Sequence, residues 1–553
     1  MNMFNWLKNL VSPPEQSVPG DGSHRLNKNI PAHPDPADES AAYKGQGDAH
    51  MLKGNLEEAA ACYRHAIALD PGYAKAHSNL GFVLKEQGNY GDAELCLKTA
   101  LSIDPEIADA YYMLGTIYQV QNRPEDAVRH FRETLESDPD HEFACRDLCY
   151  VLFEQGKIEE AKEIIARGIA HNPGIAAYHY YLGNLYSHTK EFDKAAACYR
   201  AALSIQPAYV EACFNLGIVL QEQGHPDEAI ASYRKALALK PDYSEALNNL
   251  GVTLMGLGRH DEAEASYRQA LQIKPDYAEV HSNLGAALME MGRPGEAEAS
   301  YRRALPANPK FATAHLNLGY VLIELSRQDE AEASYRRALQ INPDYADAHN
   351  NLGSALIQLG RQDEAEASYW RALQIKPDYA DAHSNLIFAM DLMFDKDTTS
   401  LQEERKRWDA THAAPLHQRQ THANIPDPAR RLRVGYVSAD FREHSAVKVF
   451  GGMLTKYDRS QFDVFAYANS KRREDRFTDL FKRSVTAWRN ISRLPDDAVE
   501  EMILEDQIDI LVDLSGHSAG NRLLVFARKP APIQITAWGY ATSTGMRAMD
   551  VFF

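Results

Sequence analysis

The chain has 553 residues, 44% of them hydrophobic, and a formal net charge of -18 at pH 7. This length is too great for one domain, and the acidic balance argues against nucleic acid or an anionic membrane as the main partner. No run of 18 apolar residues occurs, and residues 1–11 are too short and too polar for a signal peptide, so we expect a cytoplasmic protein with no membrane partner.

Residues 1–37 carry Pro13-Pro14, Pro19-Gly20 and further prolines between residues 31 and 36. Prolines among scattered polar residues cannot build a packed core, so this segment is predicted to be a disordered leader. The six cysteines lie further along the chain, and none has the paired spacing of a metal site: Cys62, Cys96, Cys145, Cys149, Cys198 and Cys213. We interpret them as reduced thiols and expect no metal.

From residue 38 to 395 the sequence repeats every 34 residues. The period is marked by prolines: Pro71, Pro105, Pro139, Pro173, Pro207, Pro241, Pro275, Pro309, Pro343 and Pro377. Three kinds of residue recur at fixed positions inside each period. One column holds mostly glycine, as at Gly285, one holds alanine, as at Ala297, and one holds a bulky and mostly aromatic residue, as at Tyr301. A 34-residue period with these columns resembles the tetratricopeptide repeat, here in ten copies and a capping helix.

One repeat shows how the columns work. Residues 278–291 are predicted to form helix A and residues 295–305 helix B, with Gly292-Arg293-Pro294 turning between them. Small residues let the two helices approach, and a tyrosine fills the space beside them. Because one helix pair cannot bury its apolar face alone, the repeats must stack into an α-solenoid, a right-handed superhelix with a concave wall.

Two polar columns lie on helix A. The first holds asparagines, whose amides can pair with the backbone of an extended peptide: Asn79, Asn215, Asn249, Asn283, Asn317, Asn351 and Asn385. We predict that those from Asn215 to Asn385 bind peptides in the concave groove, although asparagine here can also serve only neighbouring backbone. The second column holds histidines: His77, His179, His281, His315, His349 and His383. Successive repeats place them about 10 Å apart, too far for a shared metal, so they are interpreted as packing or rim residues.

The period stops after residue 395, and residues 396–430 form a proline-punctuated linker in which residues 403–408 can be helical. Strands and helices then alternate to residue 553. The expected strands are residues 432–438, 463–468, 488–491, 508–514 and 533–538, and the expected helices are residues 447–457, 474–483, 496–506 and 521–528. This alternation predicts a parallel, doubly wound sheet, and the absence of G-x-G-x-x-G after the first strand leaves a dinucleotide site unsupported.

Ligands of open parallel sheets bind beyond the carboxyl ends of the strands. Three polar loops are expected there, namely residues 438–444, 515–522 and 539–545. They carry His444, His517 and several hydroxyl side chains, which suit a sugar-like ligand.

Three stretches carry a narrower resemblance. LRVGYVSADFREH at residues 432–444, DLSGHSAGNRLLVFARKPAPIQ at residues 513–534 and the WGY ending are similar to the O-linked N-acetylglucosamine transferase family, which includes SPINDLY-type fucosyltransferases. The resemblance implies a Rossmann-like lobe of a GT-B glycosyltransferase. It also implies transfer of a sugar from a nucleotide donor, UDP-GlcNAc by preference, to Ser or Thr of proteins, with no required metal and no further cofactor.

The resemblance also implies site residues. His444 matches the active-site histidine after the first strand and is predicted to be catalytic. Gly539, Tyr540 and His517 match loops against the donor sugar and are predicted to bind it. Lys448 stands where animal members have a second histidine, which leaves the donor open.

The second lobe, which supplies most nucleotide contacts in the family, is not found before residue 553. We therefore expect residues 431–553 to be an incomplete catalytic domain and this chain to be inactive by itself, with nucleotide-sugar binding only if that lobe is supplied. Two alternatives remain: a non-catalytic repeat scaffold for partner proteins, and an enzyme of the same family that transfers fucose or modifies asparagine. A homodimer through the repeats is a further expectation.

Overall fold

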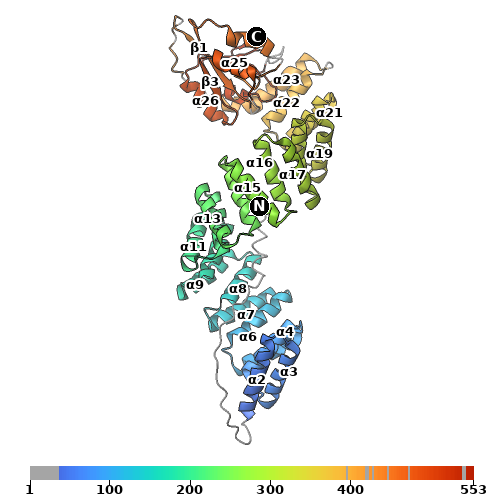
Figure 1. The fold of residues 1–553 in the computed structure, drawn as a ribbon, viewed down its shortest axis with the longest axis vertical. Helices are drawn as coiled ribbons and strands as arrows, with labels where there is room; N and C mark the ends of the chain where they lie inside the picture. Colours follow the sequence, from blue (N-terminus) through green and yellow to red (C-terminus); the bar gives the residue numbers. More distant parts are fainter. Residues whose placement is uncertain are drawn as a thin grey trace. The chain divides into compact units, whose positions relative to one another are not determined.

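A computed structural model describes residues 36–393, 396–417, 422–425, 427, 429–444, 447–470, 474–537 and 544–552. The chain divides into two compact units, residues 1–273 and 274–553, coloured blue to green and green to red (Figure 1). The leader expected at residues 1–37 lies outside the described residues, apart from its last two, which begin a helix. Within the described ranges, no helix is long and apolar enough to cross a membrane.

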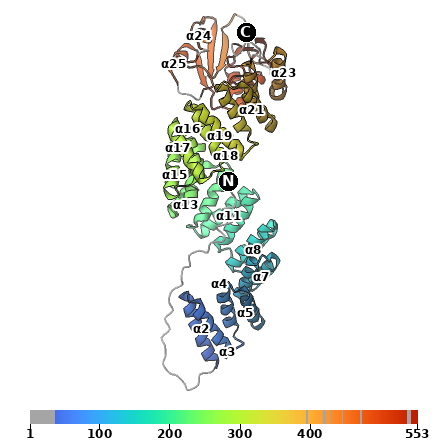
Figure 2. The same ribbon diagram turned by 90° about the vertical axis from the view of Figure 1, so that its right-hand side faces the viewer.

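The first unit consists of helix pairs joined by short turns (Figure 2). Its helices are α2 Pro36–Leu52, α3 Leu56–Leu69, α4 Ala74–Glu86, α5 Tyr90–Ile103, α6 Ala108–Val120, α7 Pro124–Ser137, α8 Glu142–Glu154, α9 Ile158–His171, α10 Ala176–His188, α11 Phe192–Ile205, α12 Val210–Glu222, α13 Pro226–Leu239, α14 Ser244–Gly256 and α15 His260–Ile273. Each pair is one repeat, and neighbouring pairs pack against each other. The predicted solenoid is therefore confirmed.

The helix pair α12 and α13 shows why glycine, proline and a tyrosine recur at fixed positions of the repeat. A Cβ on Gly217 would come within 2.5 Å of the Tyr233 ring, so only glycine allows this close packing. Gly224 ends the first helix with a φ of 76°, in the left-handed region that favours glycine. Pro226 then stands in the first turn of α13, where its missing N–H costs no hydrogen bond.

The second unit begins with further repeat helices: α16 Ala278–Glu290, α17 Pro294–Ala307, α18 Ala312–Glu324, α19 Gln328–Ile341, α20 Ala346–Gln358, α21 Gln362–Ile375 and α22 Ala380–Asp391. The first part of the expected linker is folded. It forms helix α23, Thr398–Trp408, a π-helical turn at Asp409–Ala413 and a 3-10 turn at Ala414–Leu416. Helix α23 packs on α22 and buries Arg405 and Trp408, so the linker extends the repeat array.

The remainder of the second unit is an α/β lobe. Its elements are β1 Leu432–Ser438, α24 Val447–Thr455, β2 Phe462–Ala468, α25 Arg476–Ser484, β3 Ala487–Asn490, α26 Asp496–Glu505, β4 Ile510–Asp513, α27 Leu523–Ala527, β5 Ile533–Thr536 and β6 Val551–Phe552. All strands pair in parallel, in the order β3-β2-β1-β4-β5-β6. The five predicted strands are confirmed, whereas β6, only two residues long, gave no sequence signal.

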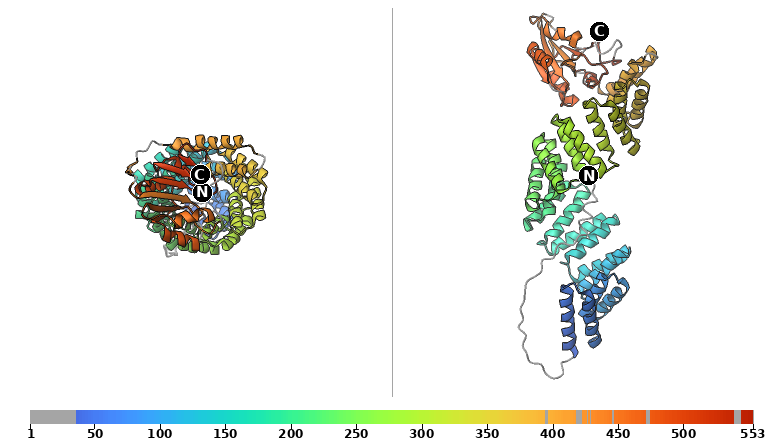
Figure 3. Two further views of the ribbon diagram at one scale, coloured as in Figure 1. Left: turned by 90° about the horizontal axis from the view of Figure 1, so that it is seen from above. Right: turned by 45° about the vertical axis from the view of Figure 1, so that its right-hand side comes forward.

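Helices cover both faces of this sheet (Figure 3). On one face Tyr467 and Leu511 pack with residues of α26 and α27 in one buried cluster. On the other face Val464 packs with Phe450 of α24 and Phe481 of α25. The predicted Rossmann-like lobe is therefore confirmed. Because β1 pairs with both β2 and β4, the strand order reverses between β1 and β4, and in such sheets ligands bind at this point.

Candidate functional site

The loops that follow β1, β2 and β4 are bonded to one another. Asn469, directly after β2, donates its backbone N–H to the Ser438 carbonyl oxygen at the end of β1, at 2.9 Å. Its side-chain amide donates to the Gly520 carbonyl oxygen, in the loop after β4, at 2.9 Å. The carboxyl ends of these strands therefore present one polar edge, which includes the predicted loops after β1 and β4; most of the loop predicted after β5 lies outside the described residues.

The loop after β1 is fixed from two further sides. Thr478 of α25 donates its hydroxyl to the Phe441 carbonyl oxygen at 2.9 Å. Asp475, which caps the start of α25, accepts the backbone N–H of Glu443 at 2.5 Å. The loop that carries His444 is thus held by the helix beside it as well as by the sheet.

His444 lines a cavity of about 580 Å³ between α24 and α25. Its side chain is 39% exposed, and its Nδ1 atom lies 3.8 Å from a carboxylate oxygen of Asp440. Val447 and Phe481 line the apolar part of the cavity, and Lys448 adds a positive charge. An exposed imidazole beside a cavity can reach the hydroxyl group of a bound molecule, which is the first geometric requirement of a general base.

His517, in the loop after β4, lies in a different environment. Only 4% of it is exposed. Its Nδ1 atom lies 3.3 Å from the Ser384 hydroxyl of α22, and its Nε2 atom lies 3.0 Å from the Thr544 carbonyl oxygen. Burial lowers the pKa of His517 to about 3, so the ring is neutral at physiological pH. The sugar-binding role of His517 stays a prediction, and in this structure both ring nitrogens contact other parts of the chain.

The contact with Ser384 belongs to a buried polar cluster between the last repeat helix and the lobe, which we call the junction cluster. Its members are His383, Ser384, Glu404, Trp408, His412 and His517. The Nδ1 atom of His383 lies 2.9 Å from Nε2 of His412, and its Nε2 atom lies 2.7 Å from Oε1 of Glu404. The rings of Trp408 and His517 pack edge to face, with their centroids 5.1 Å apart. Burial, and then the neighbouring His383, lower the pKa of His412 to about 4.

Sequence reasoning did not find the junction cluster. Its members are scattered over residues 383–517, and the column that contains His383 contains ordinary packing residues elsewhere. His281 and His349, for example, place Nε2 2.8 and 3.0 Å from the carbonyl oxygen of the proline six residues earlier. No group of three or more possible metal ligands occurs in the described part of the chain.

Sequence reasoning also missed Asp513, the last residue of β4. Its carboxylate is buried and accepts the backbone N–H groups of Ser515 and Gly516 and the hydroxyl of Thr536, at 2.9 to 3.0 Å. Burial raises the pKa of Asp513. This residue shapes the loop that carries His517, and an acidic residue at the end of the buried strand was the signal that could have identified it.

The predicted peptide-binding asparagines are half-buried, apart from Asn249, which is buried. Their amides also serve neighbouring repeats. In the first unit Asn215 donates to the side-chain oxygen of Asn184 at 2.9 Å, and in the second unit Asn385 donates to Asn350 at 2.9 Å. Part of the hydrogen-bonding capacity of this column is therefore used within the array. The predicted sugar-binding residues Gly539 and Tyr540 lie outside the described residues.

Comparison with protein families matches both parts of the chain. Residues 406–553 match the model described as "Glycosyl transferase family 41". Tetratricopeptide-repeat models match residues 73–140, 175–242, 214–278 and 283–346, among others. The chain therefore carries tetratricopeptide repeats followed by a glycosyl transferase family 41 domain.

Curated relatives match over shorter stretches. The "Probable UDP-N-acetylglucosamine--peptide N-acetylglucosaminyltransferase SPINDLY" of Petunia hybrida is 31% identical over 167 residues, which are 30% of this chain and 18% of the relative. The protein of that name in Arabidopsis thaliana is 35% identical over 130 residues, 23% of this chain and 14% of the relative. The chain thus spans less than a fifth of the length of these relatives. A solved O-GlcNAc transferase of Thermobaculum terrenum is 33% identical, with a TM-score of 0.47, over 50% of this chain and 53% of that chain.

Proposed function

We propose that this chain, which carries tetratricopeptide repeats before a glycosyl transferase family 41 domain, is the acceptor-binding part of a protein O-glycosyltransferase. The enzyme transfers N-acetylglucosamine from UDP-GlcNAc to Ser or Thr residues of proteins held by the repeats. The observation that supports this most is the joint match of residues 406–553 and of the repeats to the two parts of such enzymes. The curated relatives carry the corresponding name.

The proposed chemistry assigns a role to His444. The acceptor hydroxyl attacks C1 of the sugar as the nucleotide leaves, through a transition state with oxocarbenium character. His444 accepts or orients the hydroxyl proton, and Asp440, 3.8 Å from its Nδ1 atom, supports the charge that develops on the ring. The cavity beside His444 has an apolar wall at Phe481, which accommodates the acceptor segment next to the reacting hydroxyl.

The donor is proposed to lie at the edge formed by the loops after β1, β2 and β4 and to contact Gly539 and Tyr540. The carboxylate of Asp513 accepts two backbone N–H groups of the loop after β4, so the backbone of this loop is preorganised for a polar ligand. We propose no metal and no cofactor beyond the nucleotide sugar.

The repeats are proposed to hold the protein substrate through the asparagine column. An amide side chain offers both a hydrogen-bond donor and an acceptor to a peptide backbone, so this binding does not depend on the amino-acid sequence of the peptide. In the second unit Asn317 and Asn351 remain half-exposed and can supply such contacts. A cytoplasmic location and self-association through the repeats fit the same account and are proposed with it.

The direct test is sugar transfer by the polypeptide that the complete reading frame encodes. Radiolabelled UDP-GlcNAc, UDP-glucose and GDP-fucose are offered with a cell extract as acceptor, and labelled proteins are treated with alkali, which releases O-linked but not N-linked sugar. We expect alkali-labile label from UDP-GlcNAc. Label from GDP-fucose alone, alkali-stable label or no transfer from any donor would each overturn the proposal, the last in favour of a non-catalytic repeat scaffold.

A further inference from the structure

One repeat of the first unit departs from the period at two columns, in α8 and α9. Cys145 stands where the repeats one period earlier and later have the rings of Tyr111 and His179, a column that also lacks a ring at Cys213 and Leu247. Gly168 stands in a column that is otherwise almost entirely alanine, and a Cβ at this position would lie 3.0 Å from the ring of Tyr178. This helix pair therefore lacks a ring and a methyl group, and the buried ring of Tyr178, which stands where nearly all other repeats have alanine, packs against Gly168. Gly168 is thus the only residue of the two whose missing atoms are replaced by this ring.

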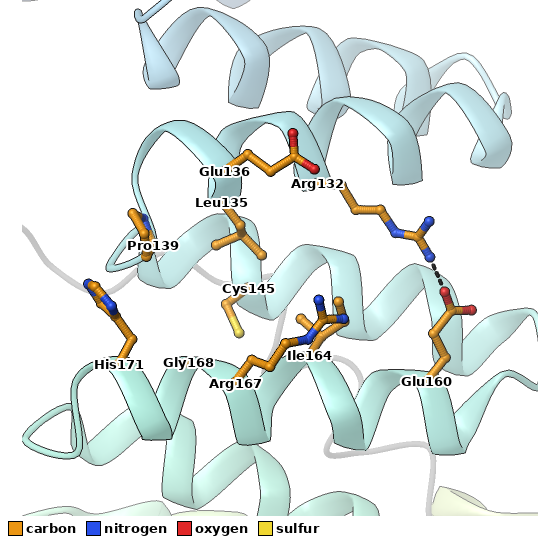
Figure 4. Close-up of a pocket in the computed structure, with 10 residues that line it drawn as sticks. All are labelled: Arg132, Leu135, Glu136, Pro139, Cys145, Glu160, Ile164, Arg167, Gly168 and His171. Atoms are coloured by element: carbon orange, nitrogen blue, oxygen red, sulfur yellow. Dashed lines mark hydrogen bonds and ion pairs between the residues drawn. The ribbon is translucent and has the colours of Figure 1, made fainter.

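The missing ring leaves space without leaving an unsatisfied backbone group. In the next repeat, the ring of His179 fills this position and places Nε2 3.1 Å from the Pro173 carbonyl oxygen. The equivalent oxygen in the altered repeat, that of Pro139, accepts the hydroxyl of Tyr178 at 3.2 Å instead. A cavity of about 560 Å³ lies between α7 and α9, and Cys145 is part of its lining (Figure 4).

The lining divides into an apolar floor and a charged rim. Leu135 and Ile164 join Cys145, Pro139 and Gly168 at the floor. A cavity of this volume with an apolar floor is in the range that holds a small organic molecule.

Among the charged residues of the rim, Arg132 and Glu160 form an ion pair, so their charges cancel at one end of the cavity (Figure 4). Arg167 and His171 lie one turn apart on α9, and within the described residues neither forms a hydrogen bond or an ion pair. By contrast Arg371, in the same repeat column as Arg167, donates to Asp344 at 2.9 Å. Glu136 is the remaining charged residue of the rim.

We propose that this cavity binds a small aromatic carboxylate. Its ring packs on the apolar lining formed by Leu135 and Ile164, and it needs no donor because Tyr178 already satisfies the Pro139 oxygen. Its carboxylate pairs with the planar fork of the Arg167 guanidinium, and His171 supplies a second donor. The negative charge of Glu136 disfavours a bound anion, so removal of this charge should strengthen binding. This site is separate from the proposed sugar transfer.

The probe is 3-phenylpropionate, compared with 3-phenylpropanol and 3-phenylpropylamine, which keep the ring and replace the carboxylate. Binding to the full chain is measured by saturation-transfer NMR. We expect a Kd of about 1 mM for the carboxylate, in line with a ligand of this size, and binding about fivefold weaker or more for the alcohol and the amine. Equal binding of all three compounds, or no binding of the carboxylate, would overturn the proposal. A tetrapeptide with a C-terminal phenylalanine and a free carboxylate is measured beside 3-phenylpropionate. The comparison tells whether a free small molecule or the C-terminus of a peptide binds more tightly, and binding of either supports the site.

Substitutions then locate the site. Arg167→Glu should weaken 3-phenylpropionate binding about tenfold, whereas Glu136→Gln should strengthen it about twofold, because a repelling charge is removed. The matched control is Lys235→Glu, the same change of sign in the same column two repeats later, which should leave the Kd unchanged. Cys145→His restores the column's ring and should abolish binding, with Cys213→His as its control. Weaker binding of Glu136→Gln, or equal effects of Arg167→Glu and Lys235→Glu, would contradict the assignment even if Cys145→His failed to fold.

Discussion

The loops after β1 and β4 follow neighbouring parallel strands and each carry a histidine, yet the two histidines have different environments. His444 is 39% exposed and lies at a cavity with Asp440 nearby. His517 is 4% exposed and contacts the repeat array through Ser384. Position at the carboxyl edge of a sheet therefore does not fix the role of a residue, because the neighbouring elements decide whether the side chain faces a ligand or the interior.

Under the proposed function, this difference favours a chemical role for the loop after β1 and a packing role for the loop after β4. A catalytic base must reach a substrate and exchange a proton with it, which His444 can do. His517 is held neutral in the junction cluster, where it joins helix α22 to the lobe. We expect substitutions in the two loops to separate activity from stability.

The largest expected effect is on catalysis. His444→Ala in the complete enzyme should lower the rate of transfer by about 10² to 10⁴, because the group that removes or orients the acceptor proton is lost. Radiolabel transfer at saturating UDP-GlcNAc measures this. An exposed histidine of the repeats, changed as His225→Ala, is the control and should retain full activity. A loss below about threefold would reduce His444 to a minor positioning role.

The second effect is on stability. His517→Ala should lower the free energy of unfolding of the second unit by about 3 kcal/mol, since a buried ring is removed and the Ser384 hydroxyl and Thr544 carbonyl lose their partner. Urea unfolding followed by tryptophan fluorescence measures it, because Trp408 lies within the junction cluster. His444→Ala should cost less than about 0.5 kcal/mol in the same experiment. Equal losses for the two variants would remove the distinction between the loops.

Sequence periodicity predicted the repeats, their small and bulky columns and the five main strands, because each follows from local pattern alone. It placed His444 and His517 on one edge for the same reason. It could not separate them, since the contact of His517 with Ser384 joins residues 133 positions apart. The same limit applies to the asparagine column: the spacing gave its position, but not that Asn215 and Asn385 bond to neighbouring repeats.

A third prediction concerns pH. The pKa values of His517 and His412 lie below the ordinary value near 6.5, at about 3 and about 4. Below pH 6.5 the unfolded chain therefore binds more protons than the folded chain, and the free energy of unfolding falls as the pH falls towards 4. Between pH 7 and 5 we expect His517 to account for a loss of about 2 kcal/mol, at 1.36 kcal/mol per pKa unit.

The control for this pH dependence is His517→Gln, which keeps hydrogen-bonding groups but does not titrate. Its stability should depend less steeply on pH than that of the unaltered chain, with urea midpoints compared at pH 7, 6 and 5. Parallel pH profiles for the two proteins would show that His517 is already protonated in the folded state, or that it is exposed to solvent.

The smallest effect is expected in the repeats. Changing Asn283, Asn317 and Asn351 together to Ala should weaken binding of extended peptides about tenfold, because bidentate backbone contacts are lost, whereas the buried Asn249 is left in place. Fluorescence anisotropy of labelled acceptor peptides measures the affinity, and circular dichroism should show unchanged helix content. Unchanged affinity, or a loss of helix, would mean that these amides serve the array alone.

Chemical modification of histidine tests the contrast between the two loops most directly. The complete enzyme is treated with diethylpyrocarbonate at pH 7, and the modified residues are identified by mass spectrometry while transfer activity is followed. The account predicts that His444 reacts early, that activity falls in step with its modification, and that His517 reacts only when urea opens the second unit. Modification of His517 at the rate of His444 in the folded enzyme, or full activity after His444 has been modified, would contradict it.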